Sequence, residues 1–484
     1  MQINRNMKIR ITPIITFLLC SMALPLFAQD SPLDTLTSHV AGIRQELDVI
    51  KRLKISGYIQ TQFQLTDSGG SKGYAGGDFA SGLDKRFQLR RARVKLQYDS
   101  PLNDRGWSTS QYVFQFDVTQ NGFSIKDMYL KFTDTWSGWF SLTAGMQNRP
   151  FGYEIPYSSS LRESPERGRM SQIIMPNERD LGAMLTIQGP KISNWNWIKL
   201  DLGMFNGTGG PSAGANTSDF DKYKDFIGHL GLSKSTKSEI IKWGLGASYY
   251  DGGFRQDVAD NYKFGTDAAG VKGFTIEKKK ADINTNLNSQ VKTKRSYIGF
   301  DAQFSIDWKI GITTVRAEYI QGDQPSTSAT SASPSALPST SVTTYTSVTT
   351  IDTTSGTGTT TTTAKTTTVA SDIYTRKFNG AYFYFLQNLG TSAWQLILKY
   401  DWYDANTDLK GDEIGKSVAS GFKASNATDL KYSTFGIGLA YRWDAAVKIT
   451  AYYDLVTNET SKNLSGATKD IMDNVFTLRA QIKF

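Results

Sequence analysis

Cysteine and histidine are almost absent from this sequence of 484 residues. The single cysteine is Cys20, and the two histidines are His39 and His229. One cysteine cannot form an internal disulfide, and two isolated histidines provide no cluster of transition-metal ligands. Nothing in the sequence near His229 suggests the partners of a histidine-based catalytic site. We therefore expect no cofactor, no metal site and no enzymatic activity.

Long apolar runs are also scarce, and the clearest one lies at the start of the chain. Residues 1–28 carry three basic residues and no acidic residue, followed by an apolar stretch that ends at Ala28. This layout is typical of a secretory signal peptide. No later segment approaches the roughly 20 apolar residues that a membrane-spanning helix needs. We expect an exported chain from which residues 1–28, and Cys20 with them, are removed.

The excess of positive charge is small. The sequence has 54 basic and 45 acidic residues, which gives a formal net charge of +9. A basic balance can indicate a nucleic-acid partner, but export argues against one. Anionic lipopolysaccharide or an anionic solute is the expected partner instead.

Residues 29–54 show a helical pattern that the rest of the chain lacks. Their apolar residues recur at alternating steps of three and four, which forms a seam of about three heptads. Ile43 and Ile50 occupy d positions of this seam, where isoleucine favours a trimer over a dimer. The pattern predicts a short periplasmic coiled-coil segment; a lone amphipathic helix is the alternative.

From residue 55 onward the apolar residues recur with a period of two, as in a β-strand. The last nine residues show this most clearly, because Phe476, Leu478, Ala480, Ile482 and Phe484 share one face and polar residues occupy the other. Such a strand with a terminal aromatic residue is typical of outer-membrane barrels, in which one face contacts lipid and the other a wet lumen.

About sixteen such segments follow one another along the chain. An even number of amphipathic strands in an exported chain predicts an all-β fold, a closed transmembrane antiparallel β-barrel of about 16 strands over residues 55–484 in a bacterial outer membrane. A barrel of this size encloses an aqueous channel. Strands are expected near residues 55–65, 86–98, 108–118, 124–133, 138–147, 180–188, 196–205, 225–233, 240–250, 295–307, 312–321, 374–387, 393–404, 431–443, 446–457 and 473–484.

The connections between these segments alternate in length, so one rim should carry short turns and the other long loops. Residues 325–370 are nearly all Ser and Thr, with scattered Pro and Gly. This composition cannot bury much apolar surface, so we predict a disordered external loop.

The segment from Lys85 to Lys95 contains six cations within eleven residues. Charged side chains are costly in lipid, so Arg91, Arg93 and Lys95 are predicted to point into the lumen. Two apolar residues upstream are out of phase with this assignment, which predicts a β-bulge near Arg90. The lumen cations either pair with acids such as Asp117 and Asp127 or form a ladder that passes anions.

Four motifs carry a resemblance to a known family. They are the Arg-Pro-Phe-Gly segment at 149–152, the Arg-Asp-Leu-Gly segment at 179–182, the Arg-Arg-Ala-Arg strand at 90–93 and the terminal aromatic residue. With them the chain resembles the phosphate-selective porin O and P family of bacterial outer-membrane proteins, from about residue 55 to residue 484.

The resemblance implies a homotrimer of sixteen-stranded barrels, each narrowed by an inward-folded loop, here about residues 152–179. The family's loop cations bind phosphate or similar anions. Acidic residues, among them Glu166 and Glu178, are interleaved with the basic ones here and could neutralise them. The candidate anion-binding cations of this region are Arg149, Arg162, Arg167, Arg169 and Arg179.

The expected function is a passive diffusion channel for small hydrophilic solutes, with a preference for anions such as phosphate. A general or sugar-selective pore is the first alternative, in which Tyr129 and Tyr452 would offer stacking surfaces. Two less expected functions are an outer-membrane hydrolase that uses His229 and an adhesin that displays residues 325–370.

Overall fold

The structure is a computed structural model that describes residues 32–68, 74–209, 219, 221–256, 259–279, 292–351 and 358–484. The predicted signal peptide lies outside these residues. The chain divides into two units at Leu53. The first contains the helix α2 (Pro32–Arg52), which covers nearly the residues of the predicted heptads. No helix in the described residues is both long and apolar enough to cross a membrane.

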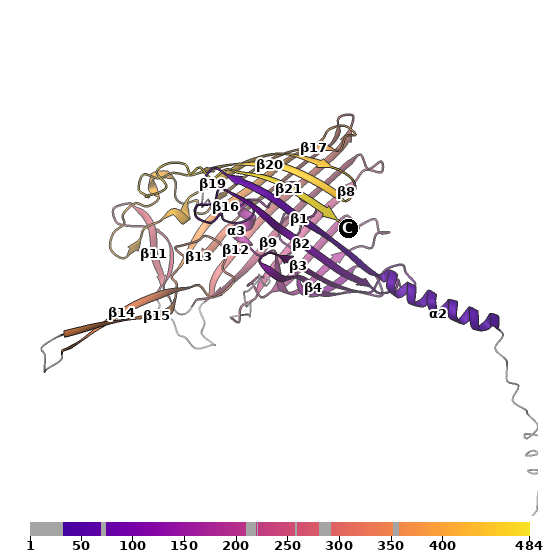
Figure 1. Ribbon diagram of the computed structural model, residues 1–484, viewed down its shortest axis with the longest axis horizontal. Helices are drawn as coiled ribbons and strands as arrows, with labels where there is room; N and C mark the ends of the chain where they lie inside the picture. Colours follow the sequence, from indigo (N-terminus) through magenta and orange to yellow (C-terminus); the bar gives the residue numbers. More distant parts are fainter. Residues whose placement is uncertain are drawn as a thin grey trace, which may run out of the picture. The chain divides into compact units, whose positions relative to one another are not determined.

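The second unit is a closed barrel of sixteen antiparallel strands, in which each strand pairs with its neighbours in sequence and the last pairs with the first (Figure 1). Each of the sixteen predicted segments corresponds to one of these strands, so the predicted fold class is confirmed. The barrel strands are β1 (Leu53–Thr66), β2 (Lys85–Asp99), β3 (Ser110–Thr119), β4 (Gly122–Thr133), β5 (Phe140–Asn148), β6 (Arg179–Gln188), β7 (Ile198–Phe205), β8 (Asp225–Ser235), β9 (Ile241–Arg255), β12 (Lys292–Trp308), β13 (Gly311–Ser326), β16 (Ile373–Asn388), β17 (Trp394–Asp404), β19 (Tyr432–Arg442), β20 (Val447–Asn458) and β21 (Val475–Lys483).

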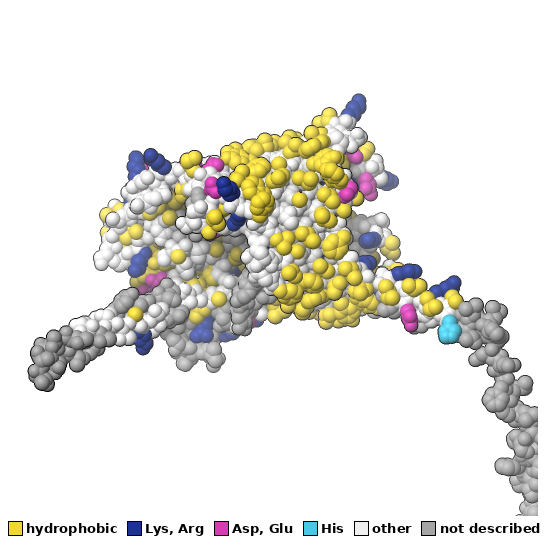
Figure 2. All heavy atoms as spheres, in the orientation of Figure 1, with side chains coloured by type: hydrophobic (Ala, Val, Ile, Leu, Met, Phe, Trp, Pro, Cys, Tyr) yellow, Lys and Arg dark blue, Asp and Glu magenta, His cyan; other side chains and the backbone are white. Residues whose placement is uncertain are grey.

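The barrel buries polar side chains and exposes apolar ones, the reverse of a soluble domain. In β21, Leu478 and Ile482 are 43% and 53% exposed, whereas Thr477 and Arg479 are 0% and 5% exposed. Apolar side chains form a belt over the outer surface of the strands (Figure 2). Such a surface is stable only against lipid, so the strands span a membrane.

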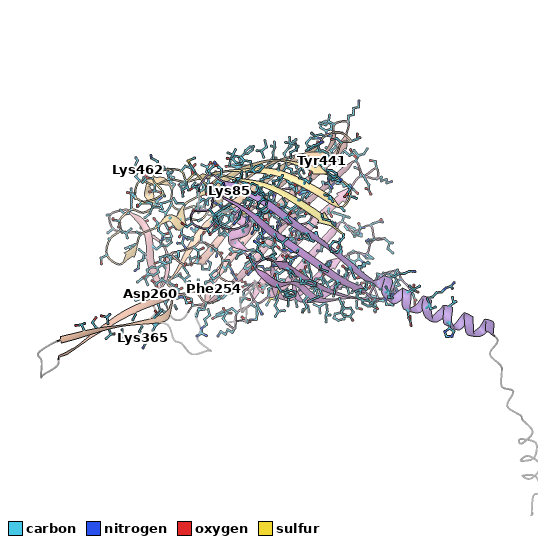
Figure 3. The ribbon with its side chains drawn as sticks, viewed as in Figure 1. Lys85, Phe254, Asp260, Lys365, Tyr441 and Lys462 are labelled. Atoms are coloured by element: carbon cyan, nitrogen blue, oxygen red, sulfur yellow. The ribbon has the colours of Figure 1, made fainter. Side chains whose placement is uncertain are left out.

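The two rims of the barrel differ. Short connections lie at the rim where β2 ends and β3 begins, and nine of the ten tryptophans lie in these turns or within three residues of them. Tryptophan concentrates at membrane–water interfaces, so this rim marks one edge of the bilayer. Tyr441 lies toward this end of the barrel and Lys462 at the opposite end (Figure 3). The connections at the opposite rim are long, apart from the two-residue turn between β3 and β4.

The long-loop rim carries additional strands that the sequence did not reveal. Strands β10 (Asn261–Thr266), β11 (Lys272–Lys278) and β18 (Phe422–Lys423) extend the sheet beyond β16. Strands β14 (Ser339–Ile351) and β15 (Gly358–Ala370) pair with each other along their whole length. Both strands lie within residues 325–370, for which the sequence predicts a disordered external loop. Threonine is β-branched and favours extended backbone even where it buries nothing.

Three short helices complete the described fold. Helix α3 (Arg169–Ile174) lies between β5 and β6, and the 3₁₀ helices η3 (Gly411–Glu413) and η4 (Ala427–Asp429) lie between β17 and β19. Helix α3 belongs to the loop that narrows the barrel.

Candidate pore constriction

The connection between β5 and β6, residues 149–178, folds into the barrel. Its apolar residues Phe151, Met170 and Ile174 are at most 1% exposed and belong to one buried cluster with Tyr250 of β9 and Ile320 of β13. The loop therefore packs against the inner surface of the wall that contains β9 and β13, and it fills part of the lumen.

The turn at Gly152 anchors the start of this loop. Its backbone has a φ of +63°, and an added Cβ would lie 1.8 Å from Oε1 of Glu318, so glycine is required here. The Gly152 amide donates a hydrogen bond to Oγ of Ser248 at 2.8 Å. The amides of Tyr153 and Glu154 donate to Oε2 of Glu318 at 3.2 and 3.0 Å. The Pro-Phe-Gly turn is thus bonded to β9 and β13.

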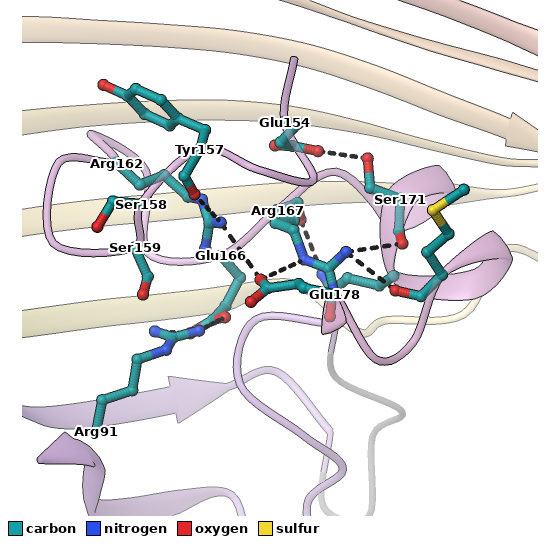
Figure 4. A network of polar contacts seen from close by, with 12 residues as sticks. Arg91, Glu154, Tyr157, Ser158, Ser159, Arg162, Glu166, Arg167, Ser171 and Glu178 are labelled. Atoms are coloured by element: carbon teal, nitrogen blue, oxygen red, sulfur yellow. Dashed lines mark hydrogen bonds and ion pairs between the residues drawn. The ribbon is translucent and has the colours of Figure 1, made fainter. Parts of the chain in front are cut away.

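The side chain of Glu154 holds the later part of the loop. It accepts hydrogen bonds from the Gly168 amide at 3.0 Å and from Oγ of Ser171 at 2.6 Å (Figure 4). The Arg169 amide donates to Oδ1 of Asp401 on β17 at 3.2 Å. These bonds fix the position of α3 inside the barrel.

Glu166 is the centre of the first ion-pair cluster. Its carboxylate lies 2.8 Å from Nε of Arg90, 2.6 Å from Nη2 of Arg91 and 2.8 Å from Nη2 of Arg479. These arginines belong to β2 and β21, so the cluster ties the loop to the seam where the barrel closes. Arg90 and Arg91 are adjacent in sequence yet contact the same carboxylate, so the alternation of faces in β2 shifts phase here, where a bulge was predicted.

Glu178 is the centre of the second cluster. Its carboxylate lies 3.1 Å from Nε of Arg167, 2.6 Å from Nη1 of Arg179 and 3.7 Å from Nη2 of Arg162 (Figure 4). Burial raises the pKa of Glu166 and Glu178, but the arginines around each carboxyl group more than offset this effect, so both pKa values lie well below the usual range. Both groups are therefore ionised and neutralise part of the loop's positive charge.

Three further arginines predicted to bind anions contact groups other than Glu166 and Glu178. Nε of Arg93 lies 3.0 Å from Oδ2 of Asp117, which is one of the pairs expected from the sequence. Arg169 is held between the rings of Tyr74 and Tyr432, with its guanidinium carbon 4.2 Å from each ring centre. Arg149 is buried and donates to the backbone carbonyl of Asn177.

An open cavity of about 500 Å³ lies between the loop and the wall formed by β2, β3 and β4. On the side of the loop that faces β17, β19 and β20, the cavity is only about 30 Å³. The larger of these two cavities thus lies beside β2–β4, and it is called the passage below. The charged residues that line this passage are Arg90, Arg91, Arg93, Lys126, Arg167 and Arg179 together with Asp78, Asp117, Glu166 and Glu178.

Four of the eight predicted cations line the passage, namely Arg91, Arg93, Arg167 and Arg179. The remaining four, Lys95, Arg149, Arg162 and Arg169, do not line it. Lys95 is partly exposed on β2, and its side chain makes no hydrogen bond or ion pair with a residue that the structure describes.

The structure changes the expectation for Tyr452 and adds Lys126 to the residues of the passage. Tyr452 is only 1% exposed, so it offers no stacking surface to a sugar, whereas Tyr129 is partly exposed. Lys126 lines the passage but was missed in the sequence. The sequence does contain a sign of this position. Lys126 and Asp127 are consecutive charged residues in a segment that otherwise alternates between apolar and polar residues, and Arg90 and Arg91 form a similar pair in β2.

The closed strand order, the apolar outer face and the tryptophan-rich rim together decide the location of this protein. The chain is a sixteen-stranded outer-membrane β-barrel. Its interior is lined by polar side chains, and an inward loop fills part of it.

Solved structures of porins and of other outer-membrane channels resemble this barrel. An anion-selective porin from Comamonas acidovorans has a TM-score of 0.47 and 9% identity, with 89% of this chain and 99% of that chain covered. The outer membrane channel DcaP of Acinetobacter baumannii has a TM-score of 0.47 and 11% identity, with 89% and 97% covered. OmpF of Salmonella typhi in complex with daunomycin has a TM-score of 0.46 and 10% identity, with 89% and 97% covered.

These similarities are too distant to indicate a solute or an assembly. A comparison of the sequence with protein-family models finds no match, and neither does a comparison with curated proteins.

Proposed function

We propose that this barrel is a porin, a passive diffusion channel for small hydrophilic solutes that favours anions. The observation that carries the proposal is the passage beside β2–β4, whose lining has six cations and four acids. Fixed cations at a constriction replace part of an anion's hydration shell, and the interleaved acids keep the interaction weak enough for release. This balance suits conduction better than tight binding.

Phosphate is one anion that the passage would admit. A guanidinium group can give two parallel hydrogen bonds to a phosphate. Here, however, Arg90 and Arg91 each place two nitrogens on Glu166. A phosphate would have to compete with that carboxylate, so a general preference for small anions is the better-supported form of the proposal.

A homotrimer is part of the same proposal. Four apolar residues of the α2 seam, Val40, Ile43, Leu47 and Ile50, are 39% to 64% exposed in the single chain. Packing this seam against two further copies would bury these side chains. The long-loop rim, where Lys462 is exposed, would contact lipopolysaccharide.

Single-channel recording in a planar bilayer tests the proposed channel. In a gradient of potassium chloride, the reversal potential is expected to show that chloride is more permeant than potassium. Phosphate added to the same bath is expected to reduce the chloride current only at high concentration. A cation-selective pore would overturn the anion preference, and a protein that folds but conducts no current would overturn the porin itself.

A further inference from the structure

Strand β4 contains a one-residue irregularity beside the passage. Gln115 of β3 lies opposite Asp127, but the next residue, Phe116, lies opposite Ile125. Lys126 is therefore left without a partner on β3, which is the arrangement of a β-bulge.

The bulge changes the direction in which Lys126 points. Met128 is 45% exposed on the outer face, so strict alternation would place Lys126 on that face as well, in contact with lipid. Instead Lys126 lines the passage, near Asp117 and Glu178. Bulges near functional sites commonly re-aim a side chain in this way.

Lys126 also differs from the arginines of the passage. The five arginines each make an ion pair with a carboxylate: Arg90 and Arg91 with Glu166, Arg93 with Asp117, and Arg167 and Arg179 with Glu178. Among the cations that line this passage in the described part of the chain, Lys126 is the one whose side chain makes no hydrogen bond or ion pair. Its ammonium group is thus the one cation of this lining, in the described residues, that has no carboxylate within ion-pair distance.

We propose that Lys126 determines the ionic preference of the pore. This proposal rests on the proposed channel function. Its ammonium group contacts one anionic group of the passing solute, which is a halide, inorganic phosphate or the carboxylate of a small organic acid. An ammonium group is a compact point charge without a fixed hydrogen-bonding plane, so it accepts anions of different shape. The nearby Asp117 and Glu178 carboxylates disfavour a second negative charge and hasten release.

Reversal potentials of three variants test this proposal, with chloride as the permeant anion. Lys126→Gln is expected to lower the ratio of chloride to potassium permeability by roughly threefold, the effect of one charge within a Debye length. Lys126→Arg is expected to retain most of the wild-type ratio. The matched control is Lys131→Gln, which removes a partly exposed lysine of the same strand that lies outside the passage, and it is expected to have a smaller effect.

Cysteine chemistry provides a test that does not depend on the glutamine variant. The only native cysteine, Cys20, lies in the predicted signal peptide, so Lys126→Cys would carry a single thiol. A cationic thiol reagent is expected to restore the preference for chloride, and an anionic reagent is expected to reverse it.

The outcomes separate the two proposals. A wild-type pore without anion preference would overturn the proposed function. A wild-type pore that favours chloride, together with a Lys126→Gln ratio equal to the wild-type ratio or reagents of opposite charge that act alike, would overturn the role of Lys126 alone.

Discussion

At the scale of single residues, the loop inside the barrel depends on carboxylates that are shared among several arginines. Glu166 contacts Arg90, Arg91 and Arg479, and the side chains of Arg91, Arg479 and Glu166 are at most 6% exposed. Removing one partner of a buried ion pair is costly because the other charges stay buried without compensation. Glu166 therefore holds the loop in place more strongly than any exposed ion pair could.

Glu166→Gln is expected to release the loop from β2 and β21. Losing one partner of a buried ion pair is destabilising by about 3–5 kcal/mol. The loop should therefore leave its docked position part of the time, and single-channel recordings should show a larger and noisier conductance than the wild type. The control is Glu413→Gln, which breaks a pair with Lys272 whose side chains are 31% and 37% exposed, and an exposed pair contributes at most about 1 kcal/mol. Equal conductance in both variants would contradict the role of Glu166.

Acid should release the loop in the same way, at a pH that follows from the depressed pKa of Glu166. A carboxyl group whose folded pKa is lowered contributes stability above its unfolded pKa, and this stability is lost as the pH falls through the folded value. The loop is thus expected to stay docked down to below about pH 4.3, the ordinary pKa of glutamate. A conductance that rises between pH 7 and pH 5 would contradict this expectation.

At the scale of elements, strands were predictable and the contacts of the loop were not. Each strand can be recognised from about ten residues, because lipid on one side and water on the other require apolar and polar side chains to alternate. Glu166 and Arg479, in contrast, are separated by 313 positions, and their contact depends on how the barrel closes. The phase shift at Arg90 was readable because it breaks a local pattern.

Strands β14 and β15 form a two-stranded ribbon whose conformation could not be derived from composition alone. Residues 325–370 are nearly all Ser and Thr, and this composition predicts a disordered external loop. A hairpin pairs its own backbone groups and needs no core to be extended. A composition that is poor in apolar residues is therefore compatible with an extended hairpin as well as with a disordered loop.

Removing this ribbon is expected to leave the pore intact. The ribbon's ends are adjacent, since the Ser371 amide donates to the Pro338 carbonyl at 2.9 Å, and β13 pairs directly with β16 beneath it. Residues 339–370 can thus be replaced by two glycines. Conductance and reversal potential should match the wild type, while any adhesive activity of the ribbon would be lost. A changed conductance would show that the ribbon contributes to the passage.

At the scale of the whole molecule, the barrel depends on one seam that joins the two ends of the sheet. The amides of Gly57 and Phe484 each donate to the other's carbonyl, at 2.9 and 3.0 Å. A Cβ at Gly57 would lie 2.5 Å from the Phe484 ring and 2.5 Å from the backbone oxygen of Arg93. The last residue thus closes the barrel over a position that only glycine fits.

Gly57→Val is expected to weaken this seam. Overpacking of this kind typically costs about 1–3 kcal/mol, so the folded barrel should unfold at a lower temperature, as measured by its heat-dependent mobility on gels. Gly228→Ala is the control, because an added Cβ there would meet no atom closer than 3.6 Å. If both variants unfold at the same temperature as the wild type, the close approach of Phe484 carries no stability.

The bulge in β4 has a consequence for how such barrels diverge. Successive side chains of a strand point to opposite faces. Inserting or deleting one residue therefore moves every following side chain to the other face, so that a charged side chain that faced the lumen would face lipid. Deletion of one residue at Lys126 would restore the regular pairing with β3 and leave the passage without its unpaired ammonium group. Descendants of this barrel could therefore change the ions they favour by a single-codon insertion or deletion, while every remaining amino acid stayed the same.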